Sequence, residues 1–186
     1  MKLHAAWLRG INAGKTGHGR KSVPMAELRE LASDLGWDPV RTYIQSGNLA
    51  FGASGRPSSL ERALEAAIEE RFGFEVPVAV RTAADLRKAR ANCPFDHESV
   101  ERAHLVHVGF AKAKLTRDVL TALEPYCERG ERVALQGSFL WADYASGVAR
   151  SKLTPAALDR AVGASVTMRN LKTLDAVCAL FDALEG

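Results

Sequence analysis

The sequence predicts an α+β protein built from two tandem βαββαβ units, each with its helices on one face of a four-stranded antiparallel sheet. Three observations lead to this fold class. The order strand, helix, strand, strand, helix, strand occurs once in each half of the chain. Val76 and Val166 are separated by the same number of positions as the hairpin glycines Gly47 and Gly137. The 186 residues are 47% hydrophobic and 25% charged, which is typical of a globular protein with a proper core.

The first half has clear start and stop signals. Apolar residues recur at helical spacing after Pro24, and glycines end both expected helices. Ser58 and Glu61 have the spacing of a capping box, in which each side chain satisfies a backbone N–H of the first helical turn. The elements expected, in order, are a strand over 3–8, a helix from Pro24 to Gly36, a hairpin turning at 46–48, a helix from Ser58 to Gly73 and a strand over 76–80.

The second half repeats this order. Thr154 followed by Pro155 is a typical helix start, and Gly163 is the corresponding stop. The elements expected are a strand over 103–110, a helix from Thr116, a hairpin turning at 137–138, a helix from Thr154 to Gly163 and a strand over 165–168. A short helix over 84–91 and a terminal amphipathic helix from Leu171 are additional to the repeat.

The expected organisation is a first ferredoxin-like unit over 1–82, a linker with a short helix over 83–102, and a second unit with the terminal helix over 103–186. The alternative is a single mixed sheet with the same elements in another order. We take the first and third strands of each unit to be parallel, so that the loops leading into its two helices emerge at one end. Loops 9–23 and 145–153 are of this kind.

Composition restricts the cellular setting. No apolar run has the length of a membrane span, and the first ten residues are too short for a signal peptide. Cys93, Cys127 and Cys178 are odd in number and widely separated, which indicates thiols in a reducing compartment. We therefore expect a cytoplasmic protein with no membrane partner, either a monomer or a homodimer.

The stretch GINAGKT, residues 10–16, resembles a nucleotide-binding phosphate loop but does not fit that motif. The motif requires a glycine five positions before the Gly-Lys pair, and Arg9 stands there. Gly17, Gly19 and Pro24 also delay the helix that should begin at once. We do not expect a nucleotide hydrolase.

The net charge of +3 is unevenly distributed. The segment 9–21 contains four basic residues and no acid, and the segment 150–172 contains five basic residues and one acid. Basic loops that lead into helix N-termini favour anions, because the helix end carries unpaired N–H groups and a partial positive charge. The candidate ligand residues are Arg9, Asn12, Lys15, Arg150, Lys152, Arg169 and Asn170. Solvated loop charge that only keeps the protein soluble is the alternative interpretation.

Four segments carry a resemblance to a known family: the long run from LRGIN through VPMAELR to YIQSGN, then VPVAVRT, RSKLT and TMRNLKT. The chain resembles, almost from end to end, the uncharacterised bacterial family called domain of unknown function 1697. The resemblance implies a small bacterial cytoplasmic protein and brings no catalytic residues. Two departures from the family pattern are a longer first loop and Leu171 in place of a tryptophan.

No catalytic constellation is recognisable. His104 and His107 fall on opposite faces of the expected strand, which makes a poor metal pair, and the run CPFDHE (93–98) is more typical of a solvated turn. We expect no metal and no cofactor. Aromatic residues on the hairpin strands raise the possibility of RNA stacking, but the ribonucleoprotein signature is missing.

Three hypotheses of function therefore remain. The first is an anion-binding module that recognises a nucleotide, a nucleic acid or a phosphorylated metabolite through the basic loops. The second is an enzyme acting on a small anionic substrate. The third is a protein-interaction or scaffold module.

Overall fold

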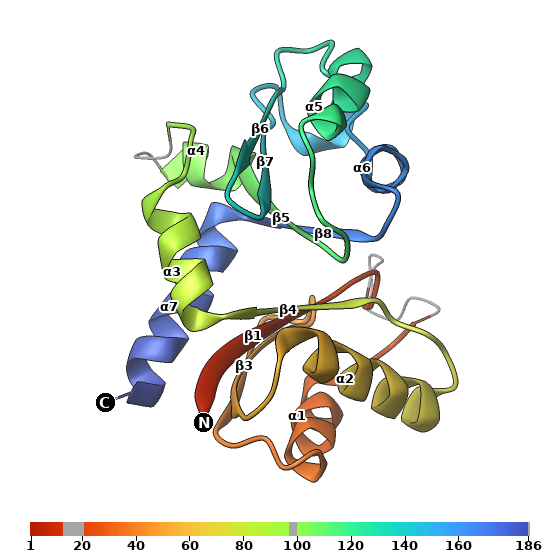
Figure 1. Ribbon diagram of the computed structural model, residues 1–186, viewed down its shortest axis with the longest axis vertical. Coiled ribbons are helices and arrows are strands. Elements are labelled where there is room, and N and C mark those ends of the chain that lie inside the picture. The colour runs from red at the N-terminus through yellow and green to blue at the C-terminus, as the bar shows by residue number, and fades with distance from the viewer. Residues whose placement is uncertain (13–20, 97–99, 186) are drawn as a thin grey trace. The chain divides into compact units, whose positions relative to one another are not determined.

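The computed structural model describes residues 1–12, 21–96 and 100–185. Within these ranges the chain forms two four-stranded antiparallel sheets and seven α-helices (Figure 1), which confirms the α+β class. The chain divides into two compact units, one made of Met1–Leu86 with Ala176–Gly186 and the other of Arg87–Asp175.

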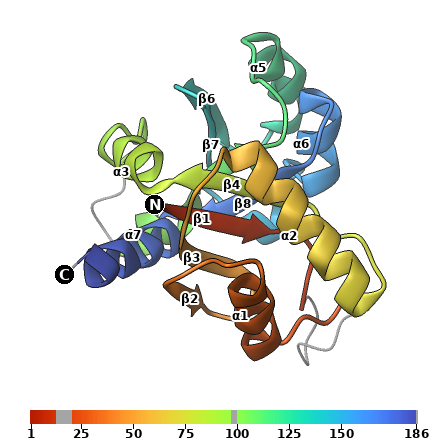
Figure 2. The ribbon, with the colours of Figure 1, turned by 60° about the horizontal axis from the view of Figure 1, so that its bottom comes forward.

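The first unit contains a sheet with the strand order β2-β3-β1-β4. Helices α1 and α2 lie on the same side of this sheet (Figures 1 and 2). The elements are β1 (Lys2–Leu8), α1 (Met25–Asp34), β2 (Val40–Tyr43), β3 (Asn48–Ala53), α2 (Pro57–Phe72) and β4 (Val78–Thr82).

The core of the first unit lies between the sheet and these two helices. Alternate residues of the strands point toward the helices, as the period of a β-strand requires. The ring of Trp37 stacks on that of Phe51, with centroids 4.0 Å apart. The buried residues that form this layer include Ala6, Leu8, Leu28, Leu31, Leu49, Phe51, Leu64, Ile68, Val78 and Val80.

The second unit has the same strand arrangement, in the order β6-β7-β5-β8, with α5 and α6 over one face. Helix α3 crosses from the first unit into the second, and α7 crosses back. The elements are α3 (Ala83–Ala91), α4 (Val100–Leu105), β5 (Val106–Ala111), α5 (Asp118–Leu123), β6 (Arg132–Gln136), β7 (Phe139–Asp143), α6 (Pro155–Val162), β8 (Val166–Asn170), α7 (Leu171–Glu185) and two 3-10 turns, Glu124–Tyr126 and Val148–Arg150.

Carboxylates from helices cover an edge strand in each unit. In the first unit, the Val78 and Val80 amides donate to Glu65 and Glu61 of α2, both at 2.8 Å. In the second, the Val166 amide donates to Asp159 of α6 at 2.9 Å. Strands β4 and β8 each form one of the two edges of their sheet, so these bonds satisfy donors that no neighbouring strand can reach.

Several local predictions are confirmed. Gly73 and Gly163 end α2 and α6 in the left-handed conformation, with φ of 76° and 72°. The Thr154 hydroxyl accepts a hydrogen bond from the Ala157 amide at the start of α6, and Pro155 is the first helical residue. None of the helices in the described ranges combines the length and the apolar character needed to cross a bilayer.

The prediction that the first and third strands are parallel is wrong. β1 pairs with β3 and β5 pairs with β7 in the antiparallel sense, because the helical crossover returns the second strand parallel to the first and the hairpin then reverses the third. Within one unit, the two strand-to-helix loops therefore leave opposite ends of the sheet. Loops 9–23 and 145–153 follow β1 and β7, which are not equivalent strands of the repeat.

Two smaller predictions also fail. Residues 103–105 belong to α4, and the strand begins only at Val106. The predicted capping box does not form, because α2 begins at Pro57 and has no side-chain cap. Glu61 instead accepts hydrogen bonds from the Val80 amide and from Arg81. Its carboxylate therefore binds an edge strand that is distant in the sequence and not the start of its own helix.

We predict that Gly52→Ala lowers the free energy of unfolding by about 1–3 kcal/mol, as overpacked sites do. A Cβ at position 52 would overlap the carbonyl oxygen of Asp38, and backbone atoms cannot move aside as a flexible side chain can. Urea denaturation measures the change, with the exposed Ser54→Ala as control. Equal midpoints for the two variants would contradict the prediction.

Candidate functional site

The predicted ligand residues are divided between the two units. Arg9 and Asn12 belong to the first unit, and Lys15 lies outside the described residues. The others belong to the second unit: Arg150, Lys152, Arg169 and Asn170. The first loop (residues 9–23) and the second loop (residues 145–153) therefore belong to different units.

Asn12 holds the two ends of the first loop against the β2–β3 turn. Its Nδ2 donates to the carbonyl oxygens of Val23 and Gln45, both at 2.8 Å, and its Oδ1 accepts from the Val23 amide at 2.8 Å. The Asn12 amide also donates to Lys21 O at 2.9 Å. Because these bonds occupy both polar atoms of its side-chain amide, Asn12 holds the loop in position.

Gly47 brings the β2–β3 turn close to the first loop. Its carbonyl accepts from the Leu8 amide at 2.9 Å, and its φ of 74° favours glycine. A Cβ there would lie 2.7 Å from both Leu8 Cβ and Ile11 Cδ1. The motifs RGIN and QSGN, which carried the family resemblance, are therefore in contact in the fold.

The described basic groups of the first loop differ in their surroundings. Arg9 is half-buried, and its amide donates to Pro77 O at 3.0 Å. The Lys21 ammonium donates to Glu75 O and lies 5.9 Å from the centre of the Phe74 ring. The loop leads into α1, which follows Pro24 and has no side-chain cap. The first amides of α1 are therefore not capped by Pro24.

The second loop, residues 145–153, is anchored to the preceding turn at residues 128–131. Ser146 Oγ donates to Arg129 O at 2.8 Å, and Lys152 Nζ lies 2.7 Å from Glu128 Oε2. The buried Glu131 also joins the two segments. Burial by itself raises the pKa of Glu131, but hydrogen bonds from the Ser151 hydroxyl and the Arg129 amide outweigh it and hold the pKa below its usual value.

These contacts leave Arg150 exposed on a fixed loop. The loop closes where the buried Tyr144 hydroxyl donates to Leu153 O at 3.2 Å. At the following helix, Thr154 already accepts from the Ala157 amide, and Pro155 has no N–H. An anion in this region would therefore bind to the side chains of the second loop and not to the N-terminus of α6.

Arg169 and Asn170 have structural contacts. Arg169 Nη1 donates to Met168 O at 3.0 Å, and burial lowers the pKa of this guanidinium to about 10. Asn170 Oδ1 accepts from the amide and the hydroxyl of Thr173, at 2.9 and 2.8 Å. Asn170 is therefore the N-cap of α7, a role that its position after a strand could have indicated.

Sequence reasoning missed a cluster at the end of β7. Asp143 is 1% exposed and is paired with Arg102 and Arg132, each through Nη2 at 2.6 Å. Burial by itself raises the pKa of Asp143, but the hydrogen bonds and charges of the two arginines outweigh it and lower the pKa. The only signal in the sequence was an acidic residue closing an otherwise apolar strand.

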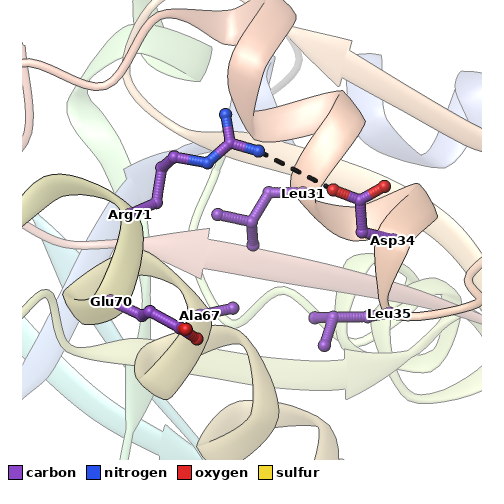
Figure 3. Close-up of a pocket in the computed structure, with 6 residues that line it drawn as sticks. All are labelled: Leu31, Asp34, Leu35, Ala67, Glu70 and Arg71. Carbon is purple, nitrogen blue, oxygen red and sulfur yellow. Dashed lines mark ion pairs between the residues drawn. The ribbon is translucent and has the colours of Figure 1, made fainter.

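The hollows of the first unit lie elsewhere. One of about 430 Å³ lies between α1 and α2, and Figure 3 shows Arg71 reaching across it toward Asp34, above Leu31 and Ala67. A second, of about 520 Å³, lies beside α1 and β2, and a third adjoins the first residues of β1. None of these three is lined by a predicted ligand residue.

Two histidines are held in the sheets. His4 Nδ1 donates to Lys2 O at 2.9 Å and His107 Nδ1 donates to Leu105 O at 3.1 Å, since a carbonyl can only accept. Burial lowers the pKa of both imidazoles. Across the described ranges, His, Cys, Asp and Glu side chains form no group of three or more suited to a metal ion.

Comparisons with known proteins give a family and a fold. A family model described as "Protein of unknown function (DUF1697)" matches residues 1–141. The solved structure of a conserved bacterial protein from Streptococcus pneumoniae is similar over 96% of this chain and 97% of that chain, with 23% identity and a TM-score of 0.72. This similarity concerns the fold alone. None of the curated proteins matches the chain.

We predict that Asn12→Asp destabilises the protein more than Asn12→Ala. The aspartate keeps the shape but directs a carboxylate at the carbonyls of Val23 and Gln45, whereas alanine only removes the bonds. We expect losses of about 1–3 kcal/mol for alanine and more for aspartate, measured by urea denaturation. Asn92→Ala, which removes one exposed bond to Lys88 O, is the control. The reverse order of the two Asn12 variants would contradict the prediction.

We predict that stability falls as the pH drops below about 6.5, the usual histidine pKa. Since the pKa values of His4 and His107 are lower in the folded chain, the unfolded chain binds more protons in this range, which favours unfolding at low pH. His4→Gln and His107→Gln should each flatten the dependence of the urea midpoint on pH. Ser54→Ala, an exposed position that carries no titratable group, should leave it unchanged, and a slope equal in all three variants would speak against this account.

Proposed function

The chain belongs to the DUF1697 family of proteins of unknown function, and we propose that it is an anion-binding module whose ligand carries phosphate groups. The proposed contacts are the basic side chains of the first and second loops. The ligand classes considered are a nucleotide, a phosphorylated metabolite and a nucleic acid, all of which present phosphate oxygens.

The observation that carries the proposal is the anchoring of the second loop. Its charged residues, Arg150 and Lys152, are both basic, and the turn at residues 128–131 holds the loop in place from outside. Lys152 and Glu128 are 60% and 52% exposed, so their pair is worth at most about 1 kcal/mol and can be exchanged for an anion. A fixed basic loop gives up little conformational entropy when it binds.

The first loop supports the same function. Asn12 fixes both of its ends, and the sequence between them contains Lys15 and Arg20 and no acid. The loop leads to α1, whose first amides lack a side-chain cap, and such an end attracts anions. Lys15 remains a predicted contact.

We also propose the finer form of the fold and the cellular location. The strand orders β2-β3-β1-β4 and β6-β7-β5-β8, each with two helices over one face, support a tandem of ferredoxin-like units. The three cysteines, which form no disulfide, are consistent with a cytoplasmic protein.

An enzyme acting on a small anion is less well supported. Such a site needs a pocket in which an acid or base faces the arginines. The three hollows described above are lined by other residues, and the carboxylates near the second loop are engaged in holding it. Binding without chemistry requires none of these features.

We predict that inorganic phosphate, a nucleoside triphosphate or single-stranded RNA raises the melting temperature at low ionic strength. A ligand of the folded state adds about 2.7 kcal/mol at one hundred times its Kd. The double variant Arg150→Gln/Lys152→Gln should lose most of the shift. The strongest of the three probes identifies the ligand class, and an RNA ligand is recognised by a steep loss of affinity with salt.

The matched control is Lys114→Gln/Arg117→Gln, which removes the same charge from exposed positions of the second unit. Its melting shift should equal that of the unmodified protein. The proposal fails if none of the three probes stabilises the protein, or if both double variants lose the shift equally, since that result would indicate only net charge.

A further inference from the structure

We propose that Arg132, oriented by the buried carboxylate of Asp143 that it shares with Arg102, forms a second binding site that takes a small carboxylate or phosphate anion. All three residues belong to the unit Arg87–Asp175. The site is separate from the second loop: Tyr144, the residue after Asp143, packs in the core under α5 and α6, and successive side chains along a strand point to opposite faces. The inference does not rest on the proposed function.

The two guanidinium groups converge on one oxygen atom. Asp143 Oδ2 accepts from Arg102 Nη2 at 2.6 Å, from Arg132 Nη2 at 2.6 Å and from Arg132 Nε at 3.3 Å. The two Nη2 atoms therefore lie within two hydrogen-bond lengths of each other. One carboxylate cannot neutralise two guanidinium groups, so the trio itself carries a positive charge, of which the nearby Asp96 carboxylate offsets the part on Arg102.

Arg132 is held in place although it is exposed. Its side chain is 59% exposed, and its guanidinium carbon lies 4.9 Å from the centre of the Phe95 ring. A freely moving arginine has about 2 kcal/mol of rotamer entropy to lose, so fixing it opposes folding. Asp143 and Phe95 together fix this one in a single orientation.

The fixed orientation leaves one edge of the guanidinium available. Of the five N–H donors of an arginine, Nε and one hydrogen of Nη2 face Asp143. The end formed by Nη1 and the other hydrogen of Nη2 has no protein partner among the described residues. Two parallel N–H groups of this kind match two oxygens of a carboxylate or phosphate.

The position of Asp143 favours the orientation of the two arginines over the strongest possible ion pairs with them. Its Oδ1 is buried and has no hydrogen-bond partner in the part of the chain that the structure describes, and the same holds for Trp141 Nε1 on the same face of β7. A buried polar atom without a partner costs about 1–3 kcal/mol. Side-on pairs would use both oxygens, whereas here both arginines are drawn to one. Asp143 is therefore a positioning residue.

The test is a titration of the ¹⁵N-labelled full chain with inorganic phosphate and, separately, with acetate. We expect the Arg132 Nε–H and Trp141 indole N–H resonances to shift together and to give one Kd for each anion. The smaller Kd identifies which of the two anions the site prefers. If neither anion shifts these resonances, the proposal is wrong.

Asp143→Asn separates orientation from charge. Removing a negative charge should tighten anion binding if net charge alone matters, whereas loss of orientation should weaken it. We expect phosphate affinity to fall about tenfold, the effect of losing one charge-assisted hydrogen bond. Equal or tighter binding would overturn the proposal.

Arg132→Lys decides the question if Asp143→Asn does not fold. Lysine keeps the charge at an exposed position but lacks the planar edge, so the Trp141 resonance should respond about tenfold more weakly to phosphate. Arg117→Gln is the control and should bind as the unmodified protein does. Arg150→Gln/Lys152→Gln should also leave the Trp141 response intact, which keeps this site distinguishable from the second loop. Unchanged binding in Arg132→Lys would overturn the proposal.

Discussion

Carboxylates from the helices accept hydrogen bonds from the outward amides of one edge strand in each sheet, and this interaction ties the two layers of each unit together. Glu61 and Glu65 do so for β4, and Asp159 does so for β8. An uncovered edge strand would present unpaired donors to another chain. The two units share this solution although their sequences have little in common. It also makes β4 and β8 poor edges for self-association, whereas β2 and β6 form the opposite edges of the two sheets.

The same carboxylates explain where sequence reasoning reached its limit. The apolar periodicity, the glycine stops at Gly73 and Gly163 and the start at Thr154 are local signals, and the elements they predicted are present. Glu61 was assigned to a local cap of its own helix, but its partner is an amide in strand β4. Strand direction is likewise set by pairing between distant segments, so the assumption of parallel first and third strands failed.

The same limit applies to the candidate site, where the sequence does not show the contacts between distant segments. Polar residues in basic segments were taken as ligand contacts, yet Asn12 and Asn170 use their amides on the backbone of their own unit. Both lie within motifs that carried the family resemblance, RGIN and TMRNLKT, which is consistent with a role in shaping these segments. The cluster at Asp143 could not be predicted from the sequence, because Arg102 and Arg132 come from separate segments and no spacing relates them.

The distribution of buried acids decides what the basic residues can do. Glu131 and Asp143 are both nearly inaccessible, and each is engaged in holding a neighbouring segment or side chain. A buried acid that only cancelled charge would be most stable with both oxygens paired. Asp143 leaves one unpaired while drawing two arginines together. Its arrangement is therefore better explained by the orientation of an exposed guanidinium than by stability, which is the reason to look for an anion there.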